Sequence, residues 1–171
     1  MDHPRKEIIS WLEVSKLISQ ILPQFEDEFE TIVMISPSGV IPAGMVAAAA
    51  GIQDIYLARV DFPPETDLEK AKLFSWPNFT QFPDQELLLE KKVLVVNNAW
   101  GSGRTTWAVT KQVESAGGMP FTCVLHYNPY RNLLKYQPDF YGAITDAYIL
   151  YPWDIDQSGP DRVFLENGGR G

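Results

Sequence analysis

The strongest constraint on the fold is a strand, loop, helix and strand that follow one another over residues 31–60. Residues 31–36 form a short apolar, β-branched run of the kind found in buried strands. A Pro-Ser-Gly loop follows, and Pro42 suits the first turn of a helix that Gly51 caps. Residues 55–60 then predict a second strand. A strand–helix–strand unit of this kind implies parallel pairing through a right-handed crossover.

The same alternation continues along the chain and predicts an α/β fold with a parallel sheet flanked by helices. We expect strands over residues 92–98, 120–127 and 143–150, and helices over residues 7–22 and 107–115. Residues 61–90 interrupt the pattern and predict a hairpin or a long loop over the sheet edge, and residues 129–141 predict irregular structure. We expect one domain over residues 1–171, with a core at about 30–155 and a frayed tail after it.

Charge and composition exclude several classes of partner. The chain has 14 Lys and Arg against 22 Asp and Glu, a net charge of −8, which disfavours nucleic acid and anionic membranes. A pocket of backbone amides can still bind a small anion. The sequence has no apolar run long enough for a membrane helix and no secretory signal, so we expect a cytoplasmic protein.

The few cysteine and histidine residues predict no metal site. The single cysteine, Cys123, lies in an apolar run and is predicted to be a buried hydrophobic residue rather than a nucleophile. His3 and His126 lack metal-ligand spacing with it.

Residues 93–106 carry the clearest chemical signal. An apolar strand leads into a Gly/Ser/Thr loop and then a helix, an arrangement that directs free backbone N–H groups and the helix dipole at one point. A phosphate monoester is the natural occupant. The loop lacks the lysine of a Walker A motif, and Thr106 stands where a dinucleotide-binding fingerprint has its third glycine. The alternative is a tight turn whose Ser and Thr cap the helix. The predicted phosphate-binding residues are Gly101, Ser102, Gly103, Arg104, Thr105 and Thr106.

This segment resembles the PRPP-binding signature of type I phosphoribosyltransferases. Residues 93–96 match its strand, and Ser102-Gly103-Arg104-Thr105 match the loop that holds a 5′-phosphate in that family. Residues 35–43, which include Pro37, Ser38 and Gly39, are similar to the family's pyrophosphate loop.

The resemblance extends to the C-terminal part of the chain. The segment Tyr151-Pro152-Trp153-Asp154 resembles one in purine-type members, which makes Trp153 a candidate for stacking on a base; core or interface packing is the alternative. The resemblance implies a phosphoribosyltransferase fold with a small hood, a nucleotide or PRPP-like ligand, and a homodimer.

The departures from the family pattern fall on the residues that carry charge. Asn97 and Asn98 occupy the ribose-side positions where the family has two acidic residues, and Gly101 stands where purine-specific members carry an Asp. Pro37 replaces an arginine of the pyrophosphate loop, and Ser38 replaces a glycine. Asparagine accepts a hydrogen bond from a hydroxyl but does not stabilise positive charge as a carboxylate does.

Three hypotheses follow. The first is a catalytically impaired homologue that retains 5′-phosphate binding. The second is an active purine-type transferase that uses PRPP and Mg²⁺, with carboxylates supplied by Asp61, Glu65, Asp67 or Asp154. The third is a non-catalytic scaffold that keeps the loop for folding. The sequence assigns no catalytic residue and no cofactor beyond Mg²⁺ in the second case.

Overall fold

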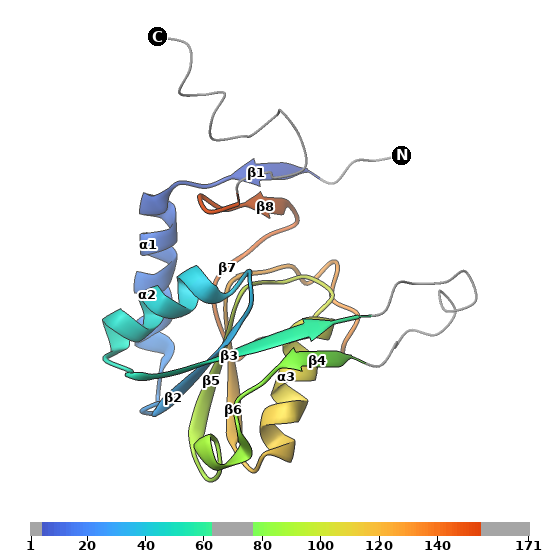
Figure 1. Ribbon diagram of the computed structural model, residues 1–171. Helices are drawn as coiled ribbons and strands as arrows, with labels where there is room; N and C mark the ends of the chain where they lie inside the picture. The colour runs from blue at the N-terminus through green and yellow to red at the C-terminus, as the bar shows by residue number, and fades with distance from the viewer. Residues whose placement is uncertain (1–4, 63–76, 155–171) are drawn as a thin grey trace, which may run out of the picture.

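A six-stranded sheet in the order β4-β3-β2-β5-β6-β7 forms the centre of the molecule (Figure 1). The computed structural model describes residues 5–62 and 77–154. Every neighbouring pair is parallel except the antiparallel pair β3–β4. The strands are β2 (Thr31–Ile35), β3 (Asp54–Asp61), β4 (Asn78–Gln81), β5 (Lys92–Trp100), β6 (Met119–Tyr127) and β7 (Phe140–Ile144).

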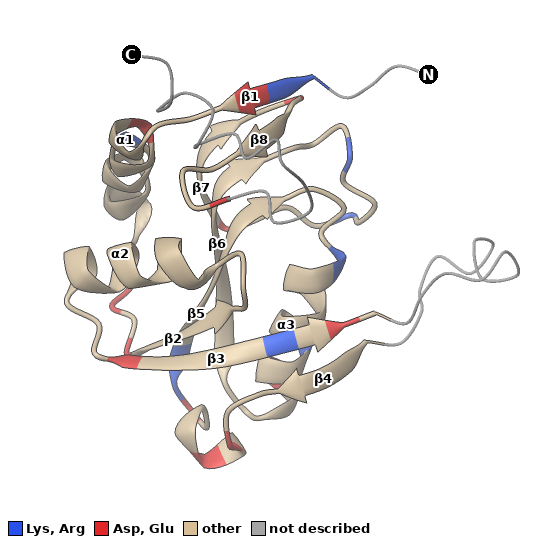
Figure 2. Ribbon diagram, turned by 45° about the horizontal axis from the view of Figure 1, so that its top comes forward, with Lys and Arg blue, Asp and Glu red and all other residues tan. Residues whose placement is uncertain are grey.

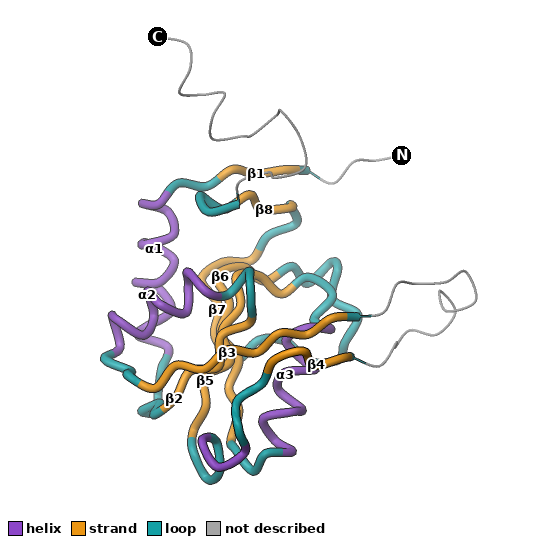
Figure 3. Tube along the Cα trace, viewed as in Figure 1, coloured by secondary structure: helices purple, strands orange, loops and turns teal. Residues whose placement is uncertain are grey.

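Helices cover both faces of this sheet (Figure 3). Helices α1 (Trp11–Ile21) and α2 (Val40–Ala50) contact one face, and α3 (Arg104–Ser115) contacts the other. Along β5, Leu94 and Val96 pack toward α1 and α2, while Val93 and Val95 pack toward α3. The strand is therefore apolar on both sides, as expected for a parallel sheet between two helical layers. Short 3₁₀ turns lie at η1 (Leu22–Gln24) and η2 (Gln85–Leu87).

The chain reverses its winding direction between β2 and β5. From β2 it passes through α2 to β3 on one side, whereas β5 lies against the other side of β2. Ligands of open α/β sheets bind outside the carboxyl ends of the strands at such a switch point. The loops after β2 and β5 therefore mark the region in which to look for a site.

A small second sheet forms a hood over the carboxyl ends of the main strands (Figure 1). It consists of β1 (Lys6–Ile8) paired in parallel with β8 (Tyr148–Leu150). An ion pair between Arg5 and Asp146 joins the same two segments. The hood therefore depends on residues at opposite ends of the chain.

Two of the predicted elements differ from the structure. The helix expected over residues 7–22 begins only at Trp11, because Ser10 caps it in a reciprocal capping box with Glu13. The strand expected over residues 143–150 is two strands in different sheets. A turn separates them, in which the backbone N–H of Ala147 donates to the Thr145 hydroxyl at 3.0 Å.

The other elements agree with the sequence to within two residues, except that α3 begins at Arg104 rather than at the predicted residue 107. Helix α2 ends at Ala50 and is capped by Gly51, whose φ is 72°, as predicted. The excursion over residues 61–90 is built on the β3–β4 hairpin at the sheet edge, with residues 63–76 outside the described part. Within the described residues, none of the helices has the length and apolarity needed to cross a bilayer.

Gly39 lies where the β2 loop approaches β5 most closely. A Cβ atom there would overlap the carbonyl oxygen of Val96 and would lie 2.9 Å from that of Ile35. Gly44, in the middle of α2, has open space where its Cβ would be. The two glycines therefore differ in steric environment although both belong to the same loop–helix segment.

We predict that Gly39→Ala destabilises the protein by about 1–3 kcal/mol, because the backbone of β2 or β5 must shift to admit the methyl group. Gly44→Ala is the matched control and should stabilise by about 0.5–1 kcal/mol, the usual gain for a helix interior. Urea unfolding of both variants measures the difference. Equal stability of the two variants would contradict the proposed close approach.

Candidate functional site

The loop between β5 and α3 is held in place by a buried tryptophan. Gly103 adopts φ 83°, and a Cβ there would lie 2.5 Å from the indole nitrogen of Trp100. The same indole N–H donates to Asn132 Oδ1 at 3.1 Å. The turn therefore requires glycine at 103, and Asn132 fixes Trp100 from the far side. Sequence reasoning singled out Gly103 but neither Trp100 nor Asn132.

The N-terminus of α3 presents unpaired donors. The backbone N–H of Arg104 lies 3.4 Å from Ser102 Oγ, and that of Trp107 donates to Gly103 O at 2.9 Å. Within the described residues, no acceptor pairs with the backbone N–H of Thr105 or Thr106. Two amides at the positive end of the helix dipole thus remain available to an anion.

The side chain of Asn97 forms hydrogen bonds with other groups of the protein. Its Oδ1 accepts from Ser38 Oγ at 2.7 Å and from the backbone N–H of Asn98 at 2.8 Å. Its Nδ2 lies 3.4 Å from the buried hydroxyl of Thr106. The Asn97 amide therefore connects the loop after β2, the end of β5 and the first turn of α3.

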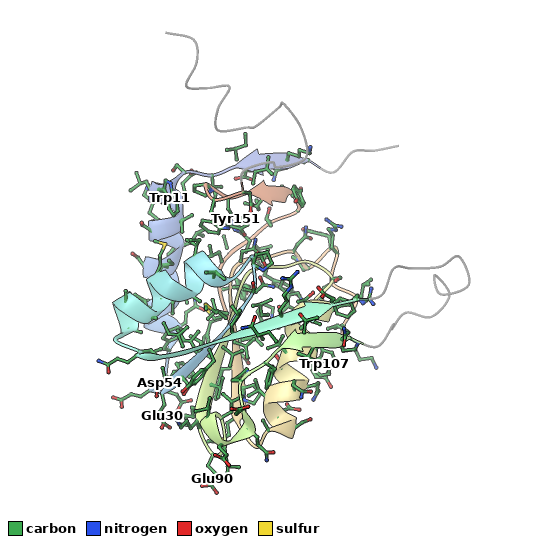
Figure 4. The ribbon with its side chains drawn as sticks, in the orientation of Figure 1. Trp11, Glu30, Asp54, Glu90, Trp107 and Tyr151 are labelled. Atoms are coloured by element: carbon green, nitrogen blue, oxygen red, sulfur yellow. The ribbon has the colours of Figure 1, made fainter. Side chains whose placement is uncertain are left out.

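A cavity of about 350 Å³ opens beside this junction. The loop after β2, the end of β5, β6 and the hood all contribute to its wall. Its lining includes Ser38, Asn98, Gly101, His126, Tyr148 and Tyr151. Figure 4 shows Tyr151 between the hood and the main sheet. Of the predicted ribose-side residues, Asn98 borders this cavity while Asn97 is buried behind it.

Tyr151, His126 and Asn98 form a buried hydrogen-bonded chain. The Tyr151 hydroxyl donates to the backbone carbonyl of Asn98 at 3.0 Å, and His126 Nδ1 lies 2.8 Å from the same hydroxyl. Burial lowers the pKa of His126 to about 4, although Glu13 opposes this shift. Burial and Asp154 raise the pKa of Tyr151 well above its usual range. Both groups are therefore neutral at neutral pH.

Three other predicted residues, Pro37, Arg104 and Trp153, do not line this cavity. Trp153 stacks on Tyr151, with ring centroids 4.8 Å apart, and contacts Trp11 at 5.7 Å. Trp153 is not among the described residues that line the cavity. Pro37 follows a cis peptide bond with Ser36. The Arg104 guanidinium lies over the Phe62 ring at 4.6 Å.

The two candidate carboxylates that the structure describes, Asp61 and Asp154, lie in different places. Asp154 borders the cavity, where its Oδ2 accepts from the backbone N–H of Tyr151 at 2.9 Å. Asp61 lies at the exposed end of β3, 3.9 Å from Arg59, and Glu65 and Asp67 lie outside the described residues. In residues 5–62 and 77–154, no three His, Cys, Asp or Glu side chains come together as a metal site would require.

Cys123 is enclosed in the core between the sheet and the α1–α2 layer. Burial raises the pKa of its thiol to about 12. The structure therefore agrees with its predicted role as a buried hydrophobic residue.

Comparison with known proteins identifies the fold. No protein-family model matches the sequence, and no curated protein matches it. Solved structures do match. A purine phosphoribosyltransferase from Pyrococcus horikoshii aligns with a TM-score of 0.71 at 22% identity, over 86% of this chain and 93% of that one. A hypothetical protein from Neisseria gonorrhoeae, solved with bound ppGpp, aligns with a TM-score of 0.77 at 21% identity, over 99% and 100% of the two chains.

A third solved structure is also similar to this chain. A xanthine-guanine-hypoxanthine phosphoribosyltransferase from Helicobacter pylori aligns with a TM-score of 0.63 at 16% identity, over 96% and 97% of the chains. These alignments, at low identity but over most of each chain, show a shared architecture. The chain therefore has the type I phosphoribosyltransferase fold, as the sequence resemblance implied.

The neutral, buried state of His126 predicts a pH dependence of stability. The unfolded chain binds a proton at about pH 6.5, whereas the folded chain resists it until about pH 4. The free energy of unfolding should therefore fall as pH drops from 6.5 to 4, by on the order of 3 kcal/mol from this residue. His126→Gln should unfold with a flatter profile in that range, since it has nothing to titrate.

Urea midpoints measured at pH 7, 5.5 and 4 for both proteins test this difference. Carboxylates such as Glu13 titrate in both proteins, so the difference between the two profiles isolates the imidazole. Identical profiles would show that His126 is not held in a neutral state.

Proposed function

We propose that this chain, which has the type I phosphoribosyltransferase fold, binds a nucleotide through its 5′-phosphate and has little or no transferase activity. The observation that carries the proposal is the pair of unpaired amides on Thr105 and Thr106 at the start of α3. Gly101, in the loop that leads to these amides, borders a cavity at the carboxyl ends of the strands, where α/β folds bind ligands.

The surrounding charge permits an anion at this point. Figure 2 marks acidic residues around η2 and at both ends of β3. Arg104 is the first residue of α3, and its guanidinium lies over the ring of Phe62, the residue after Asp61 at the end of β3. The net charge of −8 repels polyanions at long range, but the amides and the helix dipole act at hydrogen-bonding distance. A single phosphate is therefore compatible with an acidic protein.

The ribose side of the site is neutral. Asn97 already accepts from Ser38 and from the Asn98 amide, so the side chain of Asn98 is the group that is left to meet a ribose hydroxyl. A neutral hydrogen bond stabilises by about 0.5–1.5 kcal/mol, against about 1.5–3 kcal/mol for one to a charged group. Such bonds hold a ribose in place without stabilising the positive charge that develops at its anomeric carbon.

The residues on the pyrophosphate and base sides of the site also lack the groups that a transferase would use. Pro37 offers neither a charge nor an N–H to a diphosphate. Gly101 borders the cavity and has no group for proton transfer. Asp154 is engaged with the Tyr151 amide. These features support ligand binding over group transfer.

A nucleotide ligand has a precedent in the same fold. The Neisseria gonorrhoeae protein that this chain resembles over its whole length was solved with bound ppGpp, a guanosine phosphate. An active transferase is the second candidate, because several similar structures are named as purine phosphoribosyltransferases. It would require Mg²⁺ and PRPP, with carboxylates drawn from Asp61, Glu65, Asp67 or Asp154.

The phosphate site is tested by an isosteric substitution. Thr105→Val removes a hydroxyl beside the free amides, and Thr110→Val removes one from the same helix that already donates to Thr106 O. We predict that Thr105→Val weakens binding of guanosine 5′-monophosphate roughly 3- to 10-fold by calorimetry, the loss expected for one hydrogen bond. Thr110→Val should bind as the native protein does.

Guanosine without phosphate is the ligand control and should produce no heat at the same concentration. Equal affinity of guanosine and its monophosphate would contradict the phosphate site. A transfer rate typical of an enzyme, about 1–10³ turnovers per second with PRPP and a base, would support the second candidate. If neither nucleotide nor PRPP binds, the scaffold hypothesis remains.

Introducing carboxylates at positions 97 and 98 tests whether the two asparagines weaken PRPP binding on the ribose side of the site. Ser38 Oγ and the Asn98 amide both donate to position 97, so an aspartate there keeps its donors. We predict that the double variant Asn97→Asp, Asn98→Asp gains Mg²⁺-dependent PRPP binding that the native protein lacks. Calorimetry with and without Mg²⁺ measures the gain. Strong Mg²⁺-dependent binding by the native protein would instead show that the asparagines suffice.

A further inference from the structure

His126 borders the cavity, and its Nε2 has no hydrogen-bond partner among the described residues. Two polar side-chain atoms in the described residues are fully enclosed and unpartnered, Thr31 Oγ1 and Trp153 Nε1. His126 Nε2 has no hydrogen bond either, but it is not enclosed, and the residue borders the cavity beside Asn98 and Gly101. His126 also borders a second cavity, of about 310 Å³, together with Arg5, Glu7 and Thr145. Nε2 is therefore open to at least one of the two cavities.

The protonation state of this nitrogen follows from its neighbours. The Tyr151 hydroxyl has one proton, and the Asn98 carbonyl, which lies 3.0 Å away, is able only to accept. The hydroxyl therefore donates to Asn98 and must accept from His126 Nδ1, 2.8 Å away. A neutral imidazole with its proton on Nδ1 has a bare lone pair on Nε2. Nε2 is thus a hydrogen-bond acceptor for a group that reaches it.

The place of His126 determines which part of a ligand it meets. In the sheet register, His126 lies opposite Ala99, just beyond Asn98 on β5. The phosphate site is at the start of α3, and Asn98 lies on the ribose side. A nucleotide held at those two points extends its base into the part of the cavity beneath the hood, where Tyr148 and His126 border it.

We propose that His126 selects the base: its Nε2 accepts a hydrogen bond from an N–H group of the nucleobase, so a base without an N–H is bound less tightly. This inference rests on the proposed nucleotide site. Tyr151 is the positioning residue, because it fixes the tautomer through Nδ1 and touches the ligand only as part of the cavity wall. The hydrogen bonds from Tyr151 to Asn98 and from His126 to Tyr151 fix the proton on Nδ1. The folded protein itself therefore determines that Nε2 is an acceptor.

The preference for a base with an N–H group can be measured on the native protein, without any substitution. Purine riboside 5′-monophosphate has no N–H on its base, whereas the adenosine, inosine and guanosine monophosphates each have at least one. We expect the tightest of these three to bind roughly 3- to 10-fold more tightly than purine riboside 5′-monophosphate. Equal affinities would overturn the proposal.

Two substitutions by uncharged residues distinguish the roles of the two ring nitrogens of His126. The His126→Gln side chain places its amide near the position of Nε2 and keeps an acceptor there. The His126→Asn side chain places its amide near Nδ1, so it retains the contact to Tyr151 but lacks the acceptor. We expect the preference to persist in His126→Gln and to vanish in His126→Asn. A preference that survives in both variants would overturn the proposal.

The tautomer is measured independently by ¹⁵N NMR of the imidazole. We expect a protonated Nδ1 and an unprotonated Nε2 in the native protein, and loss of this fixed state in Tyr151→Phe. A proton on Nε2 would overturn the proposal even if a variant fails to fold. If no monophosphate binds at all, the proposed nucleotide site fails together with this inference. If nucleotides bind with phosphate dependence but without base preference, this inference alone fails.

Discussion

The amide of Asn97 holds together the three segments on which the site depends. It accepts from Ser38 in the loop after β2 and lies against Thr106 in the first turn of α3, while its own backbone belongs to β5. The close approach at Gly39 brings the two strand ends within reach of this side chain. A carboxylate at position 97 would accept from Ser38 and from the Asn98 amide as well, so the neutral residue makes the same two contacts without placing a charge behind the cavity.

Local sequence signals predicted the elements that position the site. The apolar runs predicted β2, β3, β5 and β6, and the Gly/Ser/Thr loop predicted the start of α3, because both patterns reflect the environment of residues close in the chain. The pairing of β1 with β8 was missed, since its partners are separated by nearly the whole chain. The same reason explains the missed contacts of Trp100 with Asn132 and of His126 with Tyr151. The capping box at Ser10 was present in the sequence and would have corrected the start of α1.

The proposed site would combine a phosphate position with recognition by neutral groups nearby. At the start of α3, the backbone amides of Thr105 and Thr106 would donate to a phosphate whether or not the rest of the site supports chemistry. Around it, Asn98, His126 and Tyr151 are all neutral and are ordered by hydrogen bonds to one another. Hydrogen bonds of fixed direction discriminate among ligands at these three residues, while Arg131 and Asp154 add charge to the cavity wall. The proposed lack of transferase activity rests on the neutral residues at positions 97 and 98, since a transferase must stabilise a developing cation.

Backbone NMR can show whether a nucleotide phosphate lies at the start of α3. We expect guanosine 5′-monophosphate to shift the amide proton signals of Thr105 and Thr106 downfield as they donate to the phosphate, while guanosine leaves both signals in place. Binding that leaves these two amides unchanged and perturbs residues elsewhere would show that the phosphate lies at another position.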